Sequence, residues 1–312
     1  MDGTSPAGRD GEAVTEVRRR LAPYVRTTPI LGIRAGDLGC EGAPLILKLE
    51  HMQHAATFKA RAAVATIMAA REERGGRLGC VAAASRGNWG VAVAWAAARL
   101  GLRARIFLPD GVPQAKIARI RGYGAEIALA GRRRGALIDA ERAWADRAGA
   151  ALLRADAPAA LAAYASLSAE IGEAVAVDTL LVPVGSGALA AGLASAARPG
   201  QRVVGVEPQR CATLHAAIAA GCPVEIGPSG IAADTLGSPR VGDAVFRIAR
   251  AHIAGVALVP DLALVEARKT LWSEARIAVE LGAAAGLAAL QTRAYEAASG
   301  ERIGILLTGG NG

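Results

Sequence analysis

Short apolar runs alternate with longer Ala-rich runs along most of the chain. A short apolar run bounded by turn residues predicts a buried strand, and a longer run of helix-forming residues predicts a helix. The predicted strands cover residues 45–49, 78–84, 104–108, 125–130, 179–184, 202–207, 255–259 and 303–308. The predicted helices cover residues 14–21, 60–70, 90–100, 113–123, 136–148, 161–175, 188–197, 211–220, 244–251, 261–271 and 283–298.

Strands that alternate with helices predict an α/β fold with parallel sheets. Because two such series follow one another, we expect two parallel-sheet domains with flanking helices and a cleft between them. Residues 24–33 are predicted to be extended, and residues 221–242 form a Gly/Pro-rich connection. Residues 1–11 are predicted to be a disordered tail.

Composition and charge limit the classes of partner that this protein is expected to bind. The 312 residues carry a formal net charge of +8, but only 4% are aromatic and the arginines are scattered, which does not favour nucleic-acid binding. A preference for anionic small molecules also fits this charge. No apolar run is long enough to span a bilayer, and the first ten residues lack the core of a signal peptide. We therefore expect a cytoplasmic protein without a membrane partner.

The cysteines and histidines give no metal signature. The four cysteines lack C-x-x-C spacing, so they predict neither a zinc site nor a disulfide framework. His51 and His54 stand three residues apart without a Cys or carboxylate partner at a helpful spacing, and we predict no metal ligands.

The segment before the second predicted helix contains the first candidate for chemistry. Residues 45–49 lead through a polar connection to Thr57-Phe58-Lys59, at the start of an Ala-rich helix. Helix N-terminal dipoles disfavour the cationic form of a lysine, and an amine with a lowered pKa suits Schiff-base chemistry. A solvated surface lysine is the alternative.

Three strand-to-helix or strand-end turns are also unusual. Ser85-Arg86-Gly87-Asn88-Trp89-Gly90 opens a helix, so its free N–H groups and the Ser85 and Asn88 side chains could receive an anion; an ordinary N-cap is the alternative. Gly185-Ser186-Gly187-Ala188-Leu189 could cradle a phosphate without a lysine, and a bare turn is the alternative. The last strand ends in Thr308-Gly309-Gly310-Asn311, which is either a frayed end or one whose Thr308 hydroxyl points into the cleft.

In this order and at these separations, the four segments resemble the fold-type II pyridoxal-phosphate (PLP) enzymes, and more narrowly the serine/threonine dehydratase and serine racemase group. The resemblance covers about residues 12–312 and implies a tryptophan synthase β-subunit-like fold. It implies a large PLP-binding domain of residues 12–78 and 153–312 and a small mobile domain of residues 79–152. It also implies PLP as the cofactor, a small-molecule amino acid as the substrate and a homodimer.

The resemblance implies roles for individual residues. Lys59 would be the internal aldimine lysine, and Asn88 would hydrogen-bond the phenolic oxygen of the cofactor. Gly185, Ser186, Gly187, Ala188 and Leu189 correspond to the phosphate loop. Thr308 falls opposite the pyridine nitrogen, and Glu280 matches a segment near the cofactor. Further implied cofactor contacts are Phe58 and Gly309, and the implied substrate contacts are Thr57, Ser85, Arg86, Gly87, Asn88 and Trp89.

The hydroxyl of Thr308 bears on the reaction type. A neutral hydroxyl does not keep the pyridine protonated as a carboxylate would, which favours prompt β-elimination over transamination. We expect a PLP-dependent lyase that converts L-threonine, L-serine or a related β-hydroxy amino acid into a 2-oxo acid and ammonia, with Lys59 as the base. The alternatives are a racemase or β-replacement enzyme with the same cofactor, and a non-catalytic anion-binding α/β protein. No separate regulatory domain is expected.

Several positions depart from the family pattern. Ala55-Ala56-Thr57 replaces the common Thr-Gly-Ser, and Trp89 replaces a common His. Arg86 stands where racemases carry a second acid/base Ser, and an arginine is a poor proton shuttle at neutral pH. Arg86 is instead a candidate to bind a second carboxylate, as in a 3-hydroxyaspartate-like substrate. The alternative is that it faces solvent or pairs with an acidic residue. Some members bind a divalent cation through a Glu and a later acid; here Glu207 is present, but Thr213 stands at the later position.

Overall fold

Ten strands in the described residues form two sheets. The computed structural model describes residues 6–131 and 133–311, with side chains from Glu12 onward. The larger sheet has the order β1-β2-β10-β7-β8-β9, and the smaller one has the order β5-β4-β3-β6. The larger sheet contains Ile30–Ile33 (β1), Leu45–Lys48 (β2), Thr179–Pro183 (β7), Arg202–Pro208 (β8), Gly255–Val259 (β9) and Ile303–Leu306 (β10). The smaller sheet contains Cys80–Ala84 (β3), Arg103–Leu108 (β4), Glu126–Leu129 (β5) and Ala151–Leu152 (β6).

All neighbouring strands are parallel except one pair. β1 pairs antiparallel with β2 at the edge of the larger sheet, where the extended segment 24–33 was predicted. The predicted α/β fold with two parallel sheets is otherwise confirmed. Since parallel strands share one carboxyl-terminal edge, the turns that follow β3, β7 and β10 lie where ligands bind in such folds.

Helices cover both faces of each sheet. On the larger sheet, α12 contacts β7 to β10 and α11 packs on α12, whereas α7 and α8 contact β7 or β8 from the other face. On the smaller sheet, α5 packs on one face and α3 on the other. The helices are Pro6–Leu21 (α1), Lys59–Glu73 (α2), Asn88–Arg99 (α3), Gln114–Gly122 (α4), Arg134–Ala148 (α5), Pro158–Ala174 (α6), Ala188–Ser195 (α7), Thr213–Ala220 (α8), Ala233–Leu236 (α9), Asp243–His252 (α10), Asp261–Ala275 (α11) and Ala285–Gln291 (α12).

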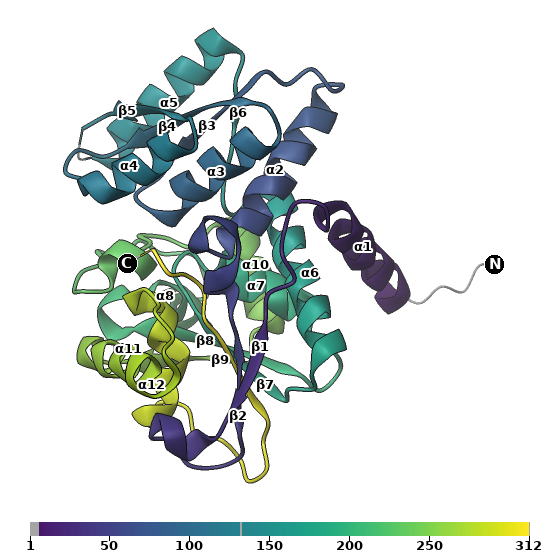
Figure 1. Cartoon of the computed structure of the whole chain (residues 1–312), viewed down its shortest axis with the longest axis vertical. Helices are drawn as coiled ribbons and strands as arrows, with labels where there is room; N and C mark the ends of the chain where they lie inside the picture. Colours follow the sequence, from purple (N-terminus) through teal and green to yellow (C-terminus); the bar gives the residue numbers. More distant parts are fainter. Residues whose placement is uncertain (1–5, 132, 312) are drawn as a thin grey trace.

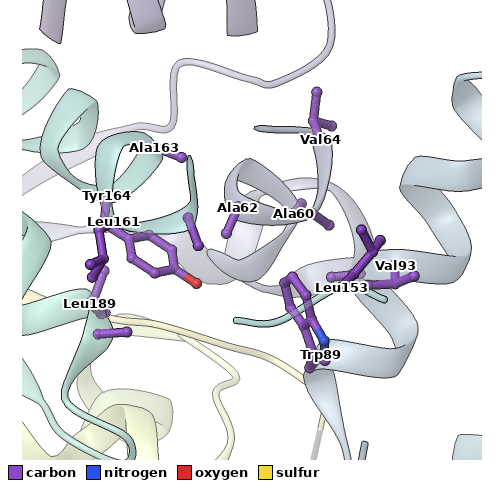
Figure 2. Close-up of a cluster of buried hydrophobic side chains, with 14 of the residues drawn as sticks. Ala60, Ala62, Val64, Trp89, Val93, Leu153, Leu161, Ala163, Tyr164 and Leu189 are labelled. Atoms are coloured by element: carbon purple, nitrogen blue, oxygen red, sulfur yellow. The ribbon is translucent and has the colours of Figure 1, made fainter. Parts of the chain in front are cut away.

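Helix α2 joins the two sheets. It lies between the upper and lower parts of the molecule in Figure 1 and contacts both α3 and α6. Its buried Ala60, Ala62 and Val64 belong to one hydrophobic cluster with Trp89 of α3 and Tyr164 of α6 (Figure 2). Small alanine side chains allow the three helices to approach closely, so the start of α2 is held by packing on two sides.

Three predicted segments were wrong in extent. α1 begins at Pro6, so residues 6–11 of the predicted tail are helical, while residues 1–5 lie outside the described residues. The predicted helix 283–298 ends at Gln291, because Arg293 adopts a left-handed φ of 57°. This turn brings the Tyr295 hydroxyl within 2.7 Å of Glu301 Oε1. The predicted connection 221–242 contains the short helix α9.

Within the described residues, no helix combines the length and apolar character needed to cross a membrane.

Candidate active site

Lys59 is the first residue of α2, and the end of the chain holds the segment before it. Phe58 N–H donates to the carbonyl of Thr308 at 3.1 Å, and Thr57 forms a β-bridge with Gly309. Gly310 N–H donates to the carbonyl of Ala56 at 3.0 Å. Backbone hydrogen bonds therefore join residues 56–58 to residues 308–310, two segments from opposite ends of the sequence that were both predicted to carry chemistry.

A buried ionic network fixes the first turn of α2 from its other side. The Arg61 side chain is 2% exposed and donates to Glu50 and Glu170, each at 2.9 Å. Lys48 Nζ donates to the same Glu170 at 2.6 Å. Two cations and two carboxylates balance in charge, which makes their burial tolerable. The network places Lys59, two residues before Arg61, at a rigid helix start.

Lys59 differs from every other lysine in the chain. The sequence has four lysines, and Lys48, Lys116 and Lys269 each form an ion pair. Among the described residues, Lys59 Nζ forms no ion pair or hydrogen bond; it lies 5.4 Å from the centroid of the Phe58 ring. Burial lowers the pKa of the Lys59 amine, and the Glu280 carboxylate opposes that shift. An amine with a lowered pKa has a larger neutral, nucleophilic fraction.

Glu280 joins the Lys59 site to α3. Asn88 Nδ2 donates to both carboxylate oxygens of Glu280, at 2.9 and 2.8 Å. Burial raises the pKa of Glu280, while Asn88 and the charge of Lys59 lower it in part. A Cβ at Gly309 would lie 2.3 Å from Glu280 Oε1, so only glycine lets this carboxylate approach the chain there. Asn88, Glu280 and Gly309 thus form one cluster beside Lys59.

In the turn before α3, some of the hydrogen-bonding groups are already paired with one another. Ser85 Oγ accepts from the N–H groups of Gly87 and Gly90 at 3.1 and 2.8 Å, as in the alternative N-cap interpretation. Trp89 is 7% exposed and packs in the hydrophobic cluster (Figure 2). Arg86 is exposed and forms no hydrogen bond or ion pair with any residue that the structure describes. Of these side chains, Arg86 is the one left free to meet a ligand.

The loop between β7 and α7 presents backbone donors. In the described residues, the N–H groups from Gly185 to Leu189 meet no acceptor, and the Ser186 hydroxyl has no hydrogen bond. Gly187 has a φ of 82°, where a side chain is strained and where a Cβ would lie 3.1 Å from Val245 Cγ1. Unpaired N–H groups at a helix start form an anion site.

Helix α9 connects this loop to the Lys59 cluster. A Cβ at Gly185 would lie 3.2 Å from the Leu236 carbonyl oxygen, and one at Gly282 would lie 2.7 Å from Leu236 Cγ. Gly282 stands two residues after Glu280. The structure therefore brings Lys59, Asn88, Glu280, Thr308 and the 185–189 loop into one continuous set of contacts. Thr308 is 3% exposed, and its hydroxyl has no hydrogen bond to a described residue.

Two residues of this region were not predicted. Asn311 Nδ2 donates to Asn88 Oδ1 at 3.0 Å and to the Ala55 carbonyl at 2.8 Å. Arg119 of α4 donates to Asn311 Oδ1. The Thr-Gly-Gly-Asn end contained the signal for Asn311, but the surface position of Arg119 on its helix carries no local signal.

Glu207 has a structural contact of its own. It is fully buried, and its two carboxylate oxygens accept from the N–H groups of Leu214 and His215 at 2.8 Å each, which caps α8. Burial raises the pKa of Glu207 to about 7, although these hydrogen bonds lower it in part. In the part of the chain that the structure describes, no three His, Cys, Asp or Glu side chains gather as metal ligands would.

Comparison with known families decides the class of this site. The model for the pyridoxal-phosphate-dependent enzymes matches residues 21–309. The chain belongs to this family. Its cofactor is PLP, as the resemblance implied, and the predicted fold type II is confirmed.

Similar proteins narrow the class further. The chain is 31% identical to phenylserine dehydratase of Ralstonia pickettii over 97% of its own length and 93% of the relative. It is 32% identical to L-threo-3-hydroxyaspartate ammonia-lyase of Saccharomyces cerevisiae over 96% and 92%. Among solved structures, maize serine racemase superposes with a TM-score of 0.90 at 29% identity, covering 96% of this chain and 93% of that one. A threonine deaminase from T.th. superposes with a TM-score of 0.87 at 32% identity, covering 96% and 98%. The predicted PLP-dependent lyase is confirmed.

The residues of this PLP enzyme fit the cofactor. Three sets of groups lack hydrogen-bond partners among the described residues: the amine of Lys59, the hydroxyl of Thr308 and the N–H groups of residues 185–189. An aldehyde, a ring nitrogen and a phosphate are the groups that such an amine, hydroxyl and set of N–H donors bind. The three unpaired sets match the three polar parts of PLP.

Proposed function

We propose that this enzyme is a dehydratase that converts L-threonine, L-serine or a related β-hydroxy amino acid into a 2-oxo acid and ammonia. The observation that supports this most is the state of Lys59, which alone of the four lysines has no ion pair to a described residue. The unpaired donors of residues 185–189 are linked to the cluster beside Lys59 through Leu236 of α9. The names of the dehydratase and ammonia-lyase relatives agree with it.

The residues would hold PLP as follows. Lys59 would carry the cofactor, and Phe58 would line the site at its side. Residues Gly185 to Leu189 would bind the phosphate through their N–H groups and the dipole of α7. Asn88 would donate to the ring oxygen, and Thr308 would hydrogen-bond the ring nitrogen without protonating it. Glu280 and Gly309 would lie beside the ring.

Bound PLP supplies an electron-withdrawing ring that stabilises negative charge on the substrate Cα. Lys59 Nζ, whose pKa is lowered by burial, would take the proton from Cα. The Cβ–O bond would then break, and the hydroxyl would take up the proton that Lys59 removed from Cα and leave as water. Hydrolysis of the released enamine takes up one water and gives the 2-oxo acid and ammonia, so no oxidant or reductant is needed.

The turn from Ser85 to Asn88 would hold the substrate carboxylate through the N–H groups near the start of α3. Ser85 shapes this turn, since its Oγ is engaged by Gly87 and Gly90. Thr57 and Trp89 would line the substrate side of the site. A guanidinium is a poor proton shuttle at neutral pH, so an arginine at position 86 favours elimination over racemisation. As an unpaired cation it would accept a second carboxylate on the substrate.

A substrate panel tests this function. The purified enzyme with PLP is given L-threonine, L-serine, phenylserine and 3-hydroxyaspartate, and the 2-oxo acid, ammonia and D-amino acid are measured. We expect the 2-oxo acid and ammonia in equal amounts. Borohydride reduction followed by peptide mass spectrometry should locate the cofactor on Lys59, and Lys59→Ala should remove both the label and the activity. D-amino acid without a 2-oxo acid would establish the racemase alternative, and a colourless protein that takes up no PLP would refute the proposal.

We also propose that residues 79–152 form a small mobile domain, that residues 12–78 and 153–312 form the PLP-binding domain, and that the enzyme is a cytoplasmic homodimer. The strands of the smaller sheet all fall within residues 80–152, which supports this division. The four free cysteines fit a reducing compartment. Sedimentation of the purified enzyme measures the oligomeric state, and limited proteolysis with and without substrate tests the movement.

A further inference from the structure

One line of hydrogen bonds runs from the surface of α4 to the cluster beside Lys59. Arg119 Nη1 donates to Asn311 Oδ1. Asn311 Nδ2 donates to Asn88 Oδ1 at 3.0 Å. Asn88 Nδ2 then donates to the two carboxylate oxygens of Glu280 at 2.9 and 2.8 Å. We name these four side chains the amide relay.

The residues at the two ends of the relay determine how the amide groups of Asn311 and Asn88 are oriented. A guanidinium has donors only, and an ionised carboxylate has acceptors only, whereas each amide has one end of each kind. Arg119 therefore requires the oxygen of Asn311, which turns the NH₂ group of Asn311 toward Asn88. The Ala55 carbonyl, an acceptor only, reinforces this orientation at 2.8 Å from Asn311 Nδ2. Asn88 must then present its oxygen to Asn311 and its NH₂ group to the site.

Glu280 alone would not hold Asn88 in this orientation in every state. Burial raises the pKa of Glu280, and a protonated carboxyl can donate as well as accept. Asn311 presents a donor to Asn88 Oδ1 whatever the charge of Glu280. The orientation of Asn88 thus depends on the Arg119 side of the relay.

We propose that Arg119 is a positioning residue that acts through Asn311 to keep the amide N–H of Asn88 turned toward the cofactor. This inference rests on the proposed function, in which Asn88 donates to the ring oxygen of PLP. Arg119 lies on α4, which belongs to the layer of the smaller sheet, and Asn311 follows β10 of the larger sheet. The relay therefore also links the two sheets.

Arg119 could instead serve only to hold α4 against the part of the molecule that contains the larger sheet, which we call docking. Three substitutions separate docking from the positioning of Asn88. Lys116, one turn before Arg119 on α4, pairs with Asp234 of α9. Lys116→Met therefore loosens docking and leaves the hydrogen bonds of the relay intact; because the Lys116 charge also lowers the pKa of Glu280, the spectra are compared over a range of pH. Asn311→Asp keeps a partner for Arg119, and with it the docking, but removes the donor to Asn88. Arg119→Met removes both contacts.

The experiment measures cofactor affinity and the absorption spectrum of the bound cofactor in these three variants. The two tautomers of bound PLP absorb at different wavelengths, and a hydrogen bond to the ring oxygen shifts their ratio. We expect Arg119→Met and Asn311→Asp to weaken PLP binding about fivefold or more and to change this ratio, as the loss of one hydrogen bond predicts. Lys116→Met should leave the ratio unchanged.

Two results would overturn the inference. One is an unchanged affinity and spectrum in Arg119→Met; the other is a shift in Lys116→Met as large as in Arg119→Met, which would assign the effect to docking. In either case a wild-type enzyme that forms the 2-oxo acid leaves the proposed function standing. A wild-type protein that takes up no PLP removes both proposals together.

Discussion

Lys59 and Glu280 act on each other's pKa. Burial lowers the pKa of Lys59 and the Glu280 charge raises it, whereas burial raises the pKa of Glu280 and the Lys59 charge lowers it. The Glu280 carboxylate stabilises the Lys59 ammonium and so raises the pKa of that amine. Removing this charge in Glu280→Gln should therefore lower the pKa of Lys59 further. The measurement is the pH dependence of lysine methylation in the PLP-free enzyme, followed peptide by peptide.

The chain supplies its own control for this titration. It has only four lysines, so the peptide that contains Lys59 is distinguished easily, and Lys269 is an exposed reference on α11. Glu280→Gln should leave the Lys269 midpoint unchanged. An unchanged or raised midpoint for Lys59 in the variant would show that the two groups do not interact as described.

The segment before Lys59 contains backbone strain. Ala55 and Ala56 have φ values of 56° and 50°, in the left-handed region that costs a residue with a Cβ about 1–2 kcal/mol. Ala56→Gly should relieve this cost, offset in part by the greater freedom of glycine in the unfolded chain. We expect the free energy of unfolding to rise by about 0.5–1 kcal/mol in urea titrations.

The control for Ala56→Gly is the same exchange in a helix. Ala143 is exposed in the middle of α5, where glycine is unfavourable, and Ala143→Gly should lower stability by about 1 kcal/mol. A loss of stability in Ala56→Gly would mean that tertiary contacts, and not steric strain, dominate at this position.

The structure also explains which parts of the site could be predicted. Lys59, residues 185–189 and Thr308 follow strands at turns with distinctive composition, and the carboxyl ends of parallel strands gather at one edge, so local patterns and fold class suffice to place them together. Arg119 lies on a predicted helix, and its partner Asn311 is 192 residues away in the sequence. No local pattern encodes such contacts.

The wrong segment boundaries have the same origin. Residues 292–298 have helix-forming composition, but the Tyr295 hydroxyl is within 2.7 Å of Glu301 Oε1, and Arg293 takes a left-handed conformation to allow this. No glycine marks the end of the helix. Tertiary hydrogen bonds overrode helix propensity there.

Glu207 should make stability depend on pH. Its pKa is raised to about 7 in the folded protein, above the usual value in an unfolded chain. Between these two values the folded state holds a proton that the unfolded state has lost, so this contribution to stability decreases as pH rises and is constant above about pH 7.

Comparison with Glu207→Gln isolates this group from the others that titrate. The difference in unfolding free energy between the wild type and the variant should change by at most about 1.4 kcal/mol per pH unit between pH 5 and pH 7. Urea titrations at pH 5, 6, 7 and 8 measure it. A difference that does not vary with pH would contradict the raised pKa.

Glu141 and Arg154 couple the end of β3 to the segment that leaves the smaller sheet. Glu141 is fully buried; it accepts from Arg154 Nη1 and Nη2 at 2.7 Å each and from the N–H of Ala84 at 2.7 Å. Ala84 directly precedes the turn proposed to hold the substrate carboxylate. Because both Glu141 oxygens accept from Arg154, the NH₂ group in Glu141→Gln faces the guanidinium in either orientation, and in one orientation it also faces the Ala84 N–H. The pair that holds the end of β3 is then lost.

We therefore expect Glu141→Gln to raise KM for the amino acid several-fold and to change kcat by less than about twofold, because Lys59 is not touched. Arg154→Met leaves a buried carboxylate without its cation and should cost about 3 kcal/mol of stability, the low end of the range because Arg154 is 37% exposed. The exposed pair Lys269–Glu266 is the control, and Glu266→Gln should cost less than about 0.5 kcal/mol. If kcat fell in Glu141→Gln while KM stayed constant, Glu141 would act on the reaction step and not on substrate binding.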